Sequence, residues 1–132
     1  MKTYKLNDLN NPLISVLMPA YNAEKYIKEA IESILNQTFS NFEFIIIDDG
    51  SIDATEEIIK SFKDSRIVYI KNEKNLGLIK TLNKGISIAR GEFIARMDSD
   101  DISMPQRFEL QLDVFKKYKG VDIVNRSEER RV

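Results

Sequence analysis

Short apolar runs alternate along this chain with longer segments in which apolar residues recur every three or four positions. The short runs predict strands over residues 13–18, 42–47, 67–70, 92–97 and 121–124. The periodic segments predict helices over residues 24–37, 53–62, 76–90 and 106–118. Strands that alternate with helices through short connections are typical of an α/β fold. We therefore predict a doubly wound, mainly parallel sheet with helices on both faces.

Several positions carry more specific expectations about these elements. Pro19 is expected to end the first strand, Asn22 to cap the first helix and Gly91 to end the third. The third helix is expected to bury a stripe made of Ile79, Leu82, Ile86 and Ala89. We expect residues 1–11 to form a flexible leader and residues 126–132 a non-native or disordered tail, which leaves residues 12–125 as the domain.

Composition narrows the chemistry that the domain can perform. The 132 residues suffice for one domain, and a net charge of −1 gives no general attraction to nucleic acid. The chain contains neither Cys nor His, which excludes disulfides, thiolate metal sites and a Ser-His-Asp triad. No apolar run approaches the span of a bilayer, so a cytoplasmic protein is expected. A peripheral membrane location stays open for a full-length protein.

Polar residues follow three of the predicted strands, at the point where each strand ends. They form the segments Pro19–Asn22, Asp48–Ser51 and Asp98–Asp101. Ligands of open parallel sheets bind at the carboxyl ends of the strands, so these segments are expected to converge on one site. Asp98 and Asp100 form a D-x-D pair that suits a hard divalent cation such as Mg²⁺. The alternative is an acidic loop that caps the next helix.

A cation held by carboxylates indicates a ligand that bears phosphates, because Mg²⁺-like ions are usually shared between the two. Asp49 could accept a ring N–H of uracil, thymine or guanine, or the segment around it could be a capping turn. Tyr21 could stack on a base or cover the sheet edge. We expect at most one of three basic residues to contact phosphate, namely Lys80, Arg90 and Arg96.

Five motifs together resemble the nucleotide-sugar-binding half of a family 2 glycosyltransferase with the GT-A fold. They are I-S-V-L-M-P-A-Y-N (14–22), S-I-L-N-Q-T-F-S-N-F-E (33–43), I-I-I-D-D-G-S-I-D-A-T (45–55), N-L-G-L (75–78) and A-R-G-E-F-I-A-R-M-D-S-D-D (89–101). The resemblance implies an inverting transfer of a sugar from a UDP, dTDP or GDP sugar, assisted by Mn²⁺ or Mg²⁺. The acceptor would be a glycan or a lipid-linked molecule, in polysaccharide or cell-surface glycan synthesis.

The same resemblance implies roles for individual residues. The nucleotide sugar would contact Pro19, Ala20, Tyr21, Asn22, Asp49, Lys80, Asp98 and Ser99, and the metal would be held by Asp98 and Asp100. The second half of the family, which holds the acceptor site and the catalytic base, has no counterpart, so this fragment alone is expected to be inactive. A non-catalytic nucleotide-binding fragment is one alternative. A phosphoacceptor receiver-like domain is another, although its acidic pair would follow the first strand.

Overall fold

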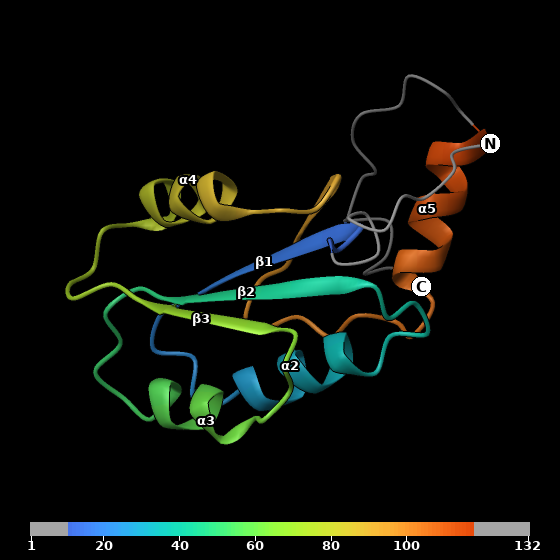
Figure 1. The fold of residues 1–132 in the computed structure, drawn as a ribbon. Coiled ribbons are helices and arrows are strands. Elements are labelled where there is room, and N and C mark those ends of the chain that lie inside the picture. Colours follow the sequence, from blue (N-terminus) through green and yellow to red (C-terminus); the bar gives the residue numbers. More distant parts are fainter. Residues whose placement is uncertain (1–10, 118–132) are drawn as a thin grey trace.

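The structure, a computed structural model, describes residues 11–117 as a single parallel sheet with helices on both faces (Figure 1). The strands are β1 (Ile14–Ala20), β2 (Phe42–Asp48), β3 (Ile67–Lys71) and β4 (Phe93–Arg96). The helices are α2 (Ile27–Leu35), α3 (Thr55–Ser61), α4 (Leu78–Ile88) and α5 (Arg107–Lys117). The order β3-β2-β1-β4 confirms the predicted fold class. The predicted strand over residues 121–124 and the predicted tail lie outside the described residues.

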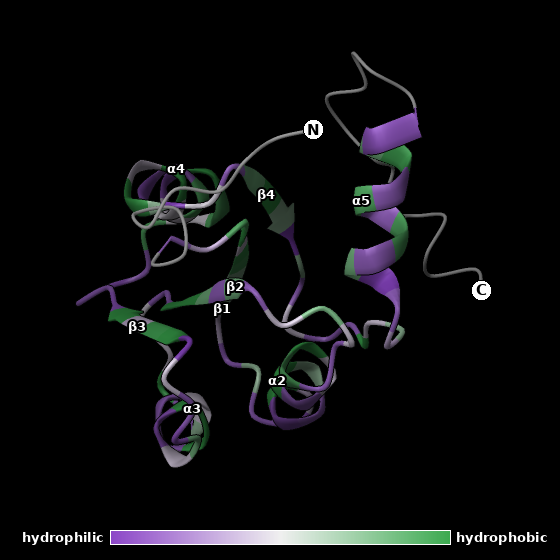
Figure 2. Cartoon of the chain, turned by 45° about the vertical axis from the view of Figure 1, so that its right-hand side comes forward, coloured by the Kyte–Doolittle hydropathy of each residue, from purple (hydrophilic) through white to green (hydrophobic). Residues whose placement is uncertain are grey.

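Two apolar layers hold the sheet between its helices. The larger layer joins alternate residues of the strands to α2, α3 and α5, and its fully buried members include Met18, Phe44, Ile46, Ile31 and Phe108. A smaller layer of Leu17, Ile45 and Ile47 faces α4 on the other side. Figures 1 and 2 show α4 across the sheet from α2 and α3. Strands β1 and β2 are therefore covered on both faces, which explains their nearly continuous apolar runs.

Pro19 does not end the first strand, contrary to the prediction, because β1 continues through it to Ala20. The N–H of Met97 donates to the carbonyl of Leu17, so the backbone polar groups of Leu17 face β4. Backbone groups alternate in direction along a strand, so those of Pro19, two residues further on, face the same side. Strand β4 pairs with β1 only as far as Leu17 and Arg96. A proline is tolerated at position 19 because its missing N–H would point beyond the end of that ladder.

The predicted apolar stripe of the third helix is wrong for Ile79 and Ile86, which are 76% and 52% exposed. The face of α4 that meets the sheet is formed instead by Thr81 and Gly85, which are buried. A Cβ atom on Gly85 would lie 3.2 Å from a methyl carbon of Leu17, so a small residue lets the helix approach the sheet closely. At this interface, small residues that allow α4 to lie close to the sheet take the place of the predicted isoleucines.

Gly91 has a packing role rather than the predicted helix-ending role, because α4 already ends at Ile88. A Cβ atom on Gly91 would lie 2.5 Å from the backbone nitrogen of Ser15, in the central strand. The Gly91 N–H donates to Ser15 Oγ at 2.7 Å, and Ser15 Oγ donates to the buried carboxylate of Glu43. Burial opposes ionisation of Glu43, but hydrogen bonds from Arg90 and Ser15 hold its pKa below the usual value.

Within residues 11–117, every helix is too short or too polar to cross a bilayer.

Candidate functional site

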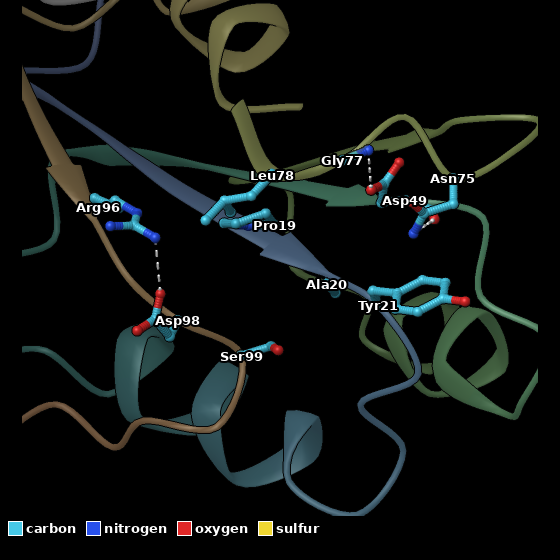
Figure 3. Close-up of a pocket in the computed structure, with 10 residues that line it drawn as sticks. All are labelled: Pro19, Ala20, Tyr21, Asp49, Asn75, Gly77, Leu78, Arg96, Asp98 and Ser99. Carbon is cyan, nitrogen blue, oxygen red and sulfur yellow. Dashed lines mark hydrogen bonds and ion pairs between the residues drawn. The ribbon is translucent and has the colours of Figure 1, made fainter. Parts of the chain in front are cut away.

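A cavity of about 340 Å³ opens at the carboxyl ends of β1, β2 and β4 (Figure 3). It is lined by Pro19, Ala20, Tyr21, Asp49, Asn75, Gly77, Leu78, Arg96, Asp98 and Ser99. The predicted convergence of three strand-end segments is therefore seen in the structure. Two predicted contact residues, Asn22 and Lys80, do not belong to this lining. Lys80 lies exposed on α4, and Arg90 lies near the opposite ends of the strands, paired with Glu43 at 3.1 Å.

The carboxylate of Asp49, the residue that follows β2, is 4% exposed and turns toward the loop before α4. Its Oδ1 atom accepts the N–H of Leu76 at 2.8 Å, and its Oδ2 atom accepts the N–H of Gly77 at 3.0 Å. Burial alone would raise the pKa of Asp49, but these hydrogen bonds and one from Asn72 hold it below its ordinary value. Asp49 is thus ionised near neutral pH and fixes the loop that forms one wall of the cavity.

A chain of side chains extends from Asp49 away from the cavity. Asn72, which is 2% exposed, donates from Nδ2 to Asp49 Oδ1 at 2.9 Å and to Thr81 Oγ1 at 3.2 Å. The ammonium group of Lys84 donates to Asn72 Oδ1 at 2.8 Å. Because Lys84 has only donors, it fixes which end of the Asn72 amide faces Asp49.

The loops that follow β1 and β2 are joined by five hydrogen bonds, which we call the loop staple; it links residues 22–24 to residues 51–55. Asn22 adopts a φ of 47° and accepts the N–H of Ile52 on its Oδ1 atom at 2.9 Å. Asn22 therefore does not cap α2 as predicted, since that helix starts five residues later at Ile27. Asp53 accepts the N–H of Thr55 at 2.9 Å, which shows the turn expected as the alternative for this segment, but the N-cap of α3 is Ala54 and not Ser51 or Asp53.

The acidic turn after β4 gathers three carboxylates on the far side of the cavity. One oxygen each from Asp98, Asp100 and Asp101 lie within 4.8 Å of one another. Arg96 donates to Asp98 at 3.3 Å, and both side chains are partly exposed, so this ion pair adds little to stability. Oxygen ligands at these separations fit around a single Mg²⁺ or Mn²⁺ ion, which binds carboxylate oxygens at about 2.0–2.2 Å.

Tyr21 lies beside Asp49 in the cavity wall, with 51% of its surface exposed (Figure 3). Half of its surface is open to solvent, so Tyr21 is not a core residue, and both base stacking and cover of the sheet edge stay predictions. Arg96 is the one of the three candidate phosphate-contacting cations that lines the cavity. An open aromatic ring, a buried carboxylate and a basic side chain thus share one concave surface.

Sequence reasoning missed the residues that build the wall next to Asp49. Asn75, Gly77 and Leu78 line the cavity, and Asn72 and Lys84 support it from behind. The N-L-G-L motif at residues 75–78 was a signal for the first group, but its role was not assigned. Nothing in the spacing of Asn72 and Lys84 linked them to Asp49, because their contact depends on how α4 lies on the sheet.

The fold and this cavity define an α/β domain whose ligand site lies at the carboxyl ends of its strands. The sequence profile of the family described as "Glycosyl transferase family 2" matches residues 15–130. The chain belongs to that family. The receiver-like alternative is therefore set aside, and the resemblance found in the five motifs is confirmed.

Relatives and solved structures agree with this assignment. The chain is 46% identical over 123 residues to an uncharacterised glycosyltransferase of Methanocaldococcus jannaschii, covering 90% of the chain and 42% of that protein. It is 37% identical over 123 residues to the Escherichia coli UDP-Glc:α-D-GlcNAc-diphosphoundecaprenol β-1,3-glucosyltransferase WfgD, covering 89% and 49%. Staphylococcus aureus TarS 1–349 in complex with UDP-GlcNAc superposes with a TM-score of 0.74 at 27% identity, covering 85% and 37%. The chain thus spans less than half of each.

Proposed function

We propose that this chain is the donor-binding half of an inverting, metal-dependent glycosyltransferase that uses a nucleotide diphosphate sugar. The observation that carries the proposal is the placement of Asp49 and the Asp98–Asp101 turn on two sides of one cavity. A volume of about 340 Å³ lies in the range of small-ligand sites. Family membership and a TarS relative that binds UDP-GlcNAc support the same ligand class.

The two sides of the cavity suit the two ends of such a donor. On one side, Asp49 accepts an N–H from the base and the exposed ring of Tyr21 stacks on it. On the other side, Asp98 and Asp100 hold a divalent cation, which when bound would stabilise the negative charge of the departing diphosphate. Ser99, between Asp98 and Asp100 in the sequence, contributes a hydroxyl group to the cavity. Arg96 contributes a positive charge near the phosphates. Pro19 and Ala20 form the floor, with Asn22 and Lys80 kept as outer donor contacts.

The complete reaction requires more than these residues supply. No carboxylate in the described part of the chain is assigned as the catalytic base, and we place that base and the acceptor site in the second half of a longer protein. WfgD, by its name, uses UDP-glucose and a diphosphoundecaprenol-linked acceptor and forms a β-1,3 linkage. By analogy, the acceptor here is a glycan or a lipid-linked molecule, the pathway is glycan synthesis, and the location is cytoplasmic or at the membrane surface. The isolated fragment binds donor without transferring sugar.

Isothermal titration with UDP, dTDP and GDP sugars, with and without Mn²⁺, tests the proposal. We expect Mn²⁺ to tighten binding of at least one donor by roughly tenfold or more, which corresponds to one charge-assisted contact. Asp100→Asn should abolish the Mn²⁺ effect, whereas Asp113→Asn, which changes an exposed carboxylate on α5, should leave it intact. A folded protein that binds no nucleotide sugar under either condition would refute the proposal.

A further inference from the structure

We propose that Arg107, the first residue of α5, is a positioning residue that holds the two ends of the acidic turn at residues 98–101 and so shapes the cation site of Asp98 and Asp100. This inference rests on the proposed function, because it assumes that these two carboxylates bind a divalent cation. Arg107 does not belong to the cavity lining and is 4% exposed. It therefore acts on the cation only through the backbone that carries the ligands.

The guanidinium group of Arg107 contacts the chain on both sides of the acidic turn. Its Nη2 atom donates to the carbonyl of Arg96 at 2.9 Å, at the end of β4 and two residues before Asp98. Its Nη1 atom donates to Ser103 Oγ at 3.1 Å, two residues after Asp101. Because both nitrogens belong to one planar group, these hydrogen bonds hold the two ends of the turn at a fixed separation.

Both ends are also bound to the body of the domain. The N–H of Met97 donates to a carbonyl of β1 at 2.9 Å, and the N–H of Ser103 donates to Ser33 Oγ on α2 at 3.0 Å. Between the two ends, the N–H of Asp101 donates to the carbonyl of Asp98 at 3.1 Å. The ends of the turn are thus anchored, and residues 98–101 between them are the part that adjusts to a cation. Figure 3 shows Asp98 and Ser99 on this segment, beside the cavity.

Packing alone does not explain an arginine at position 107. An apolar side chain would fill the same buried space without the cost of removing a charge from water. The positive charge of Arg107 alone would repel a bound cation, so its benefit must come from the geometry that its hydrogen bonds impose. Groups behind metal ligands act in this way, because they fix the orientation of the ligands before the metal binds.

Titration of Mn²⁺ into the full chain, with and without UDP, tests the inference; electron paramagnetic resonance measures the free Mn²⁺. Arg107→Lys keeps the charge but cannot join Arg96 to Ser103 in the same way, because an ammonium group lacks the planar fork of donors. We expect this variant to weaken Mn²⁺ binding by roughly tenfold or more. UDP binding without Mn²⁺ should stay unchanged, since Asp49 and Tyr21 belong to other loops. A purely structural defect would weaken both.

Two further variants separate turn geometry from stability. Ser103→Ala removes one acceptor of Arg107 with a smaller change to the core, and it should weaken Mn²⁺ binding by roughly threefold or more. Leu112→Val is the matched control, because it leaves a small cavity under α5 without changing a contact of the turn. It should lower the melting temperature and leave the Mn²⁺ affinity of the folded protein unchanged.

The outcomes distinguish this inference from the proposed function. If folded Arg107→Lys and Ser103→Ala proteins bind Mn²⁺ as tightly as the unaltered protein, the inference is overturned and the donor site stands. An equal loss of Mn²⁺ affinity in Leu112→Val would also overturn it, because the effect would then follow stability. If the unaltered protein binds no Mn²⁺ with or without UDP, the metal-dependent part of the proposed function is refuted, and this inference falls with it.

Discussion

Gly91→Ala places a methyl group against the backbone of the central strand and should be among the most destabilising small changes available in this chain. The new Cβ atom would lie 2.5 Å from Ser15 N, 2.7 Å from Ile14 C and 2.7 Å from Ser15 Oγ. These atoms belong to β1, which pairs on both sides and cannot retreat. Overpacking of this kind costs about 1–3 kcal/mol, and loss of the Gly91 hydrogen bond to Ser15 adds about 1 kcal/mol.

Alanine also restricts the unfolded chain, which offsets about 0.5 kcal/mol of that cost. The net loss is therefore about 1.5–3.5 kcal/mol, a large part of the ~5–15 kcal/mol that stabilises a typical domain. With a urea m-value of about 1.5 kcal/mol/M, the unfolding midpoint should fall by about 1–2 M. Urea titration followed by circular dichroism measures this shift.

Gly85→Ala is the matched control, because the change in the unfolded chain is the same. The three atoms nearest to its Cβ atom would be methyl carbons of Leu17 and Ile47, at 3.2–3.4 Å. Alanine gains about 1 kcal/mol over glycine in a helix, which roughly balances the tight contact, so stability should stay within about 1 kcal/mol of the unaltered protein. Equal midpoints for the Gly91 and Gly85 variants would refute the packing role given to Gly91.

Four further substitutions test three other features. Asn22→Ala should cost about 1 kcal/mol in urea titration, because the N–H of Ile52 loses its acceptor; an unchanged midpoint would argue against the loop staple. The folded-state pKa of Glu43 is lowered, so its stabilisation is present above the unfolded value of about 4.5 and is lost as the pH falls through the folded value. Glu43→Gln should flatten that part of the pH–stability curve, and a curve parallel to the original would contradict this. Ile79→Lys should change the melting temperature by less than about 2 °C, whereas Thr81→Lys should lower it strongly.

The overall fold followed from the sequence because the apolar pattern is strong where both faces of a strand are covered. The run at residues 42–47 predicted β2 within one residue of its bounds. The faces of α4 could not be predicted in the same way. Periodicity indicates that a helix has an apolar side, but at this interface Gly85 sets the distance to the sheet and the apolar side remains exposed.

The candidate site was predictable where its residues follow strands directly. Asp49 and Asp98 belong to segments whose position at strand ends can be inferred from order alone, and both line the cavity. Asn72 and Lys84 were missed because hydrogen-bond partners 12 residues apart, on a strand end and a helix, depend on tertiary placement. Pro19 was misjudged as a strand end because the prediction did not consider which neighbour its missing N–H would face.

The loop staple has a consequence for how the protein accommodates a ligand. Residues 22–24 and 51–55 are tied in both directions, so Tyr21 and Asp49 belong to one rigid half of the mouth. Any adjustment on ligand entry must then fall mainly on the opposite half, at residues 98–101, whose backbone lies outside regular secondary structure. Hydrogen exchange should accordingly be slow at the N–H of Ile52 and fast across that acidic turn, with ligand slowing only the latter.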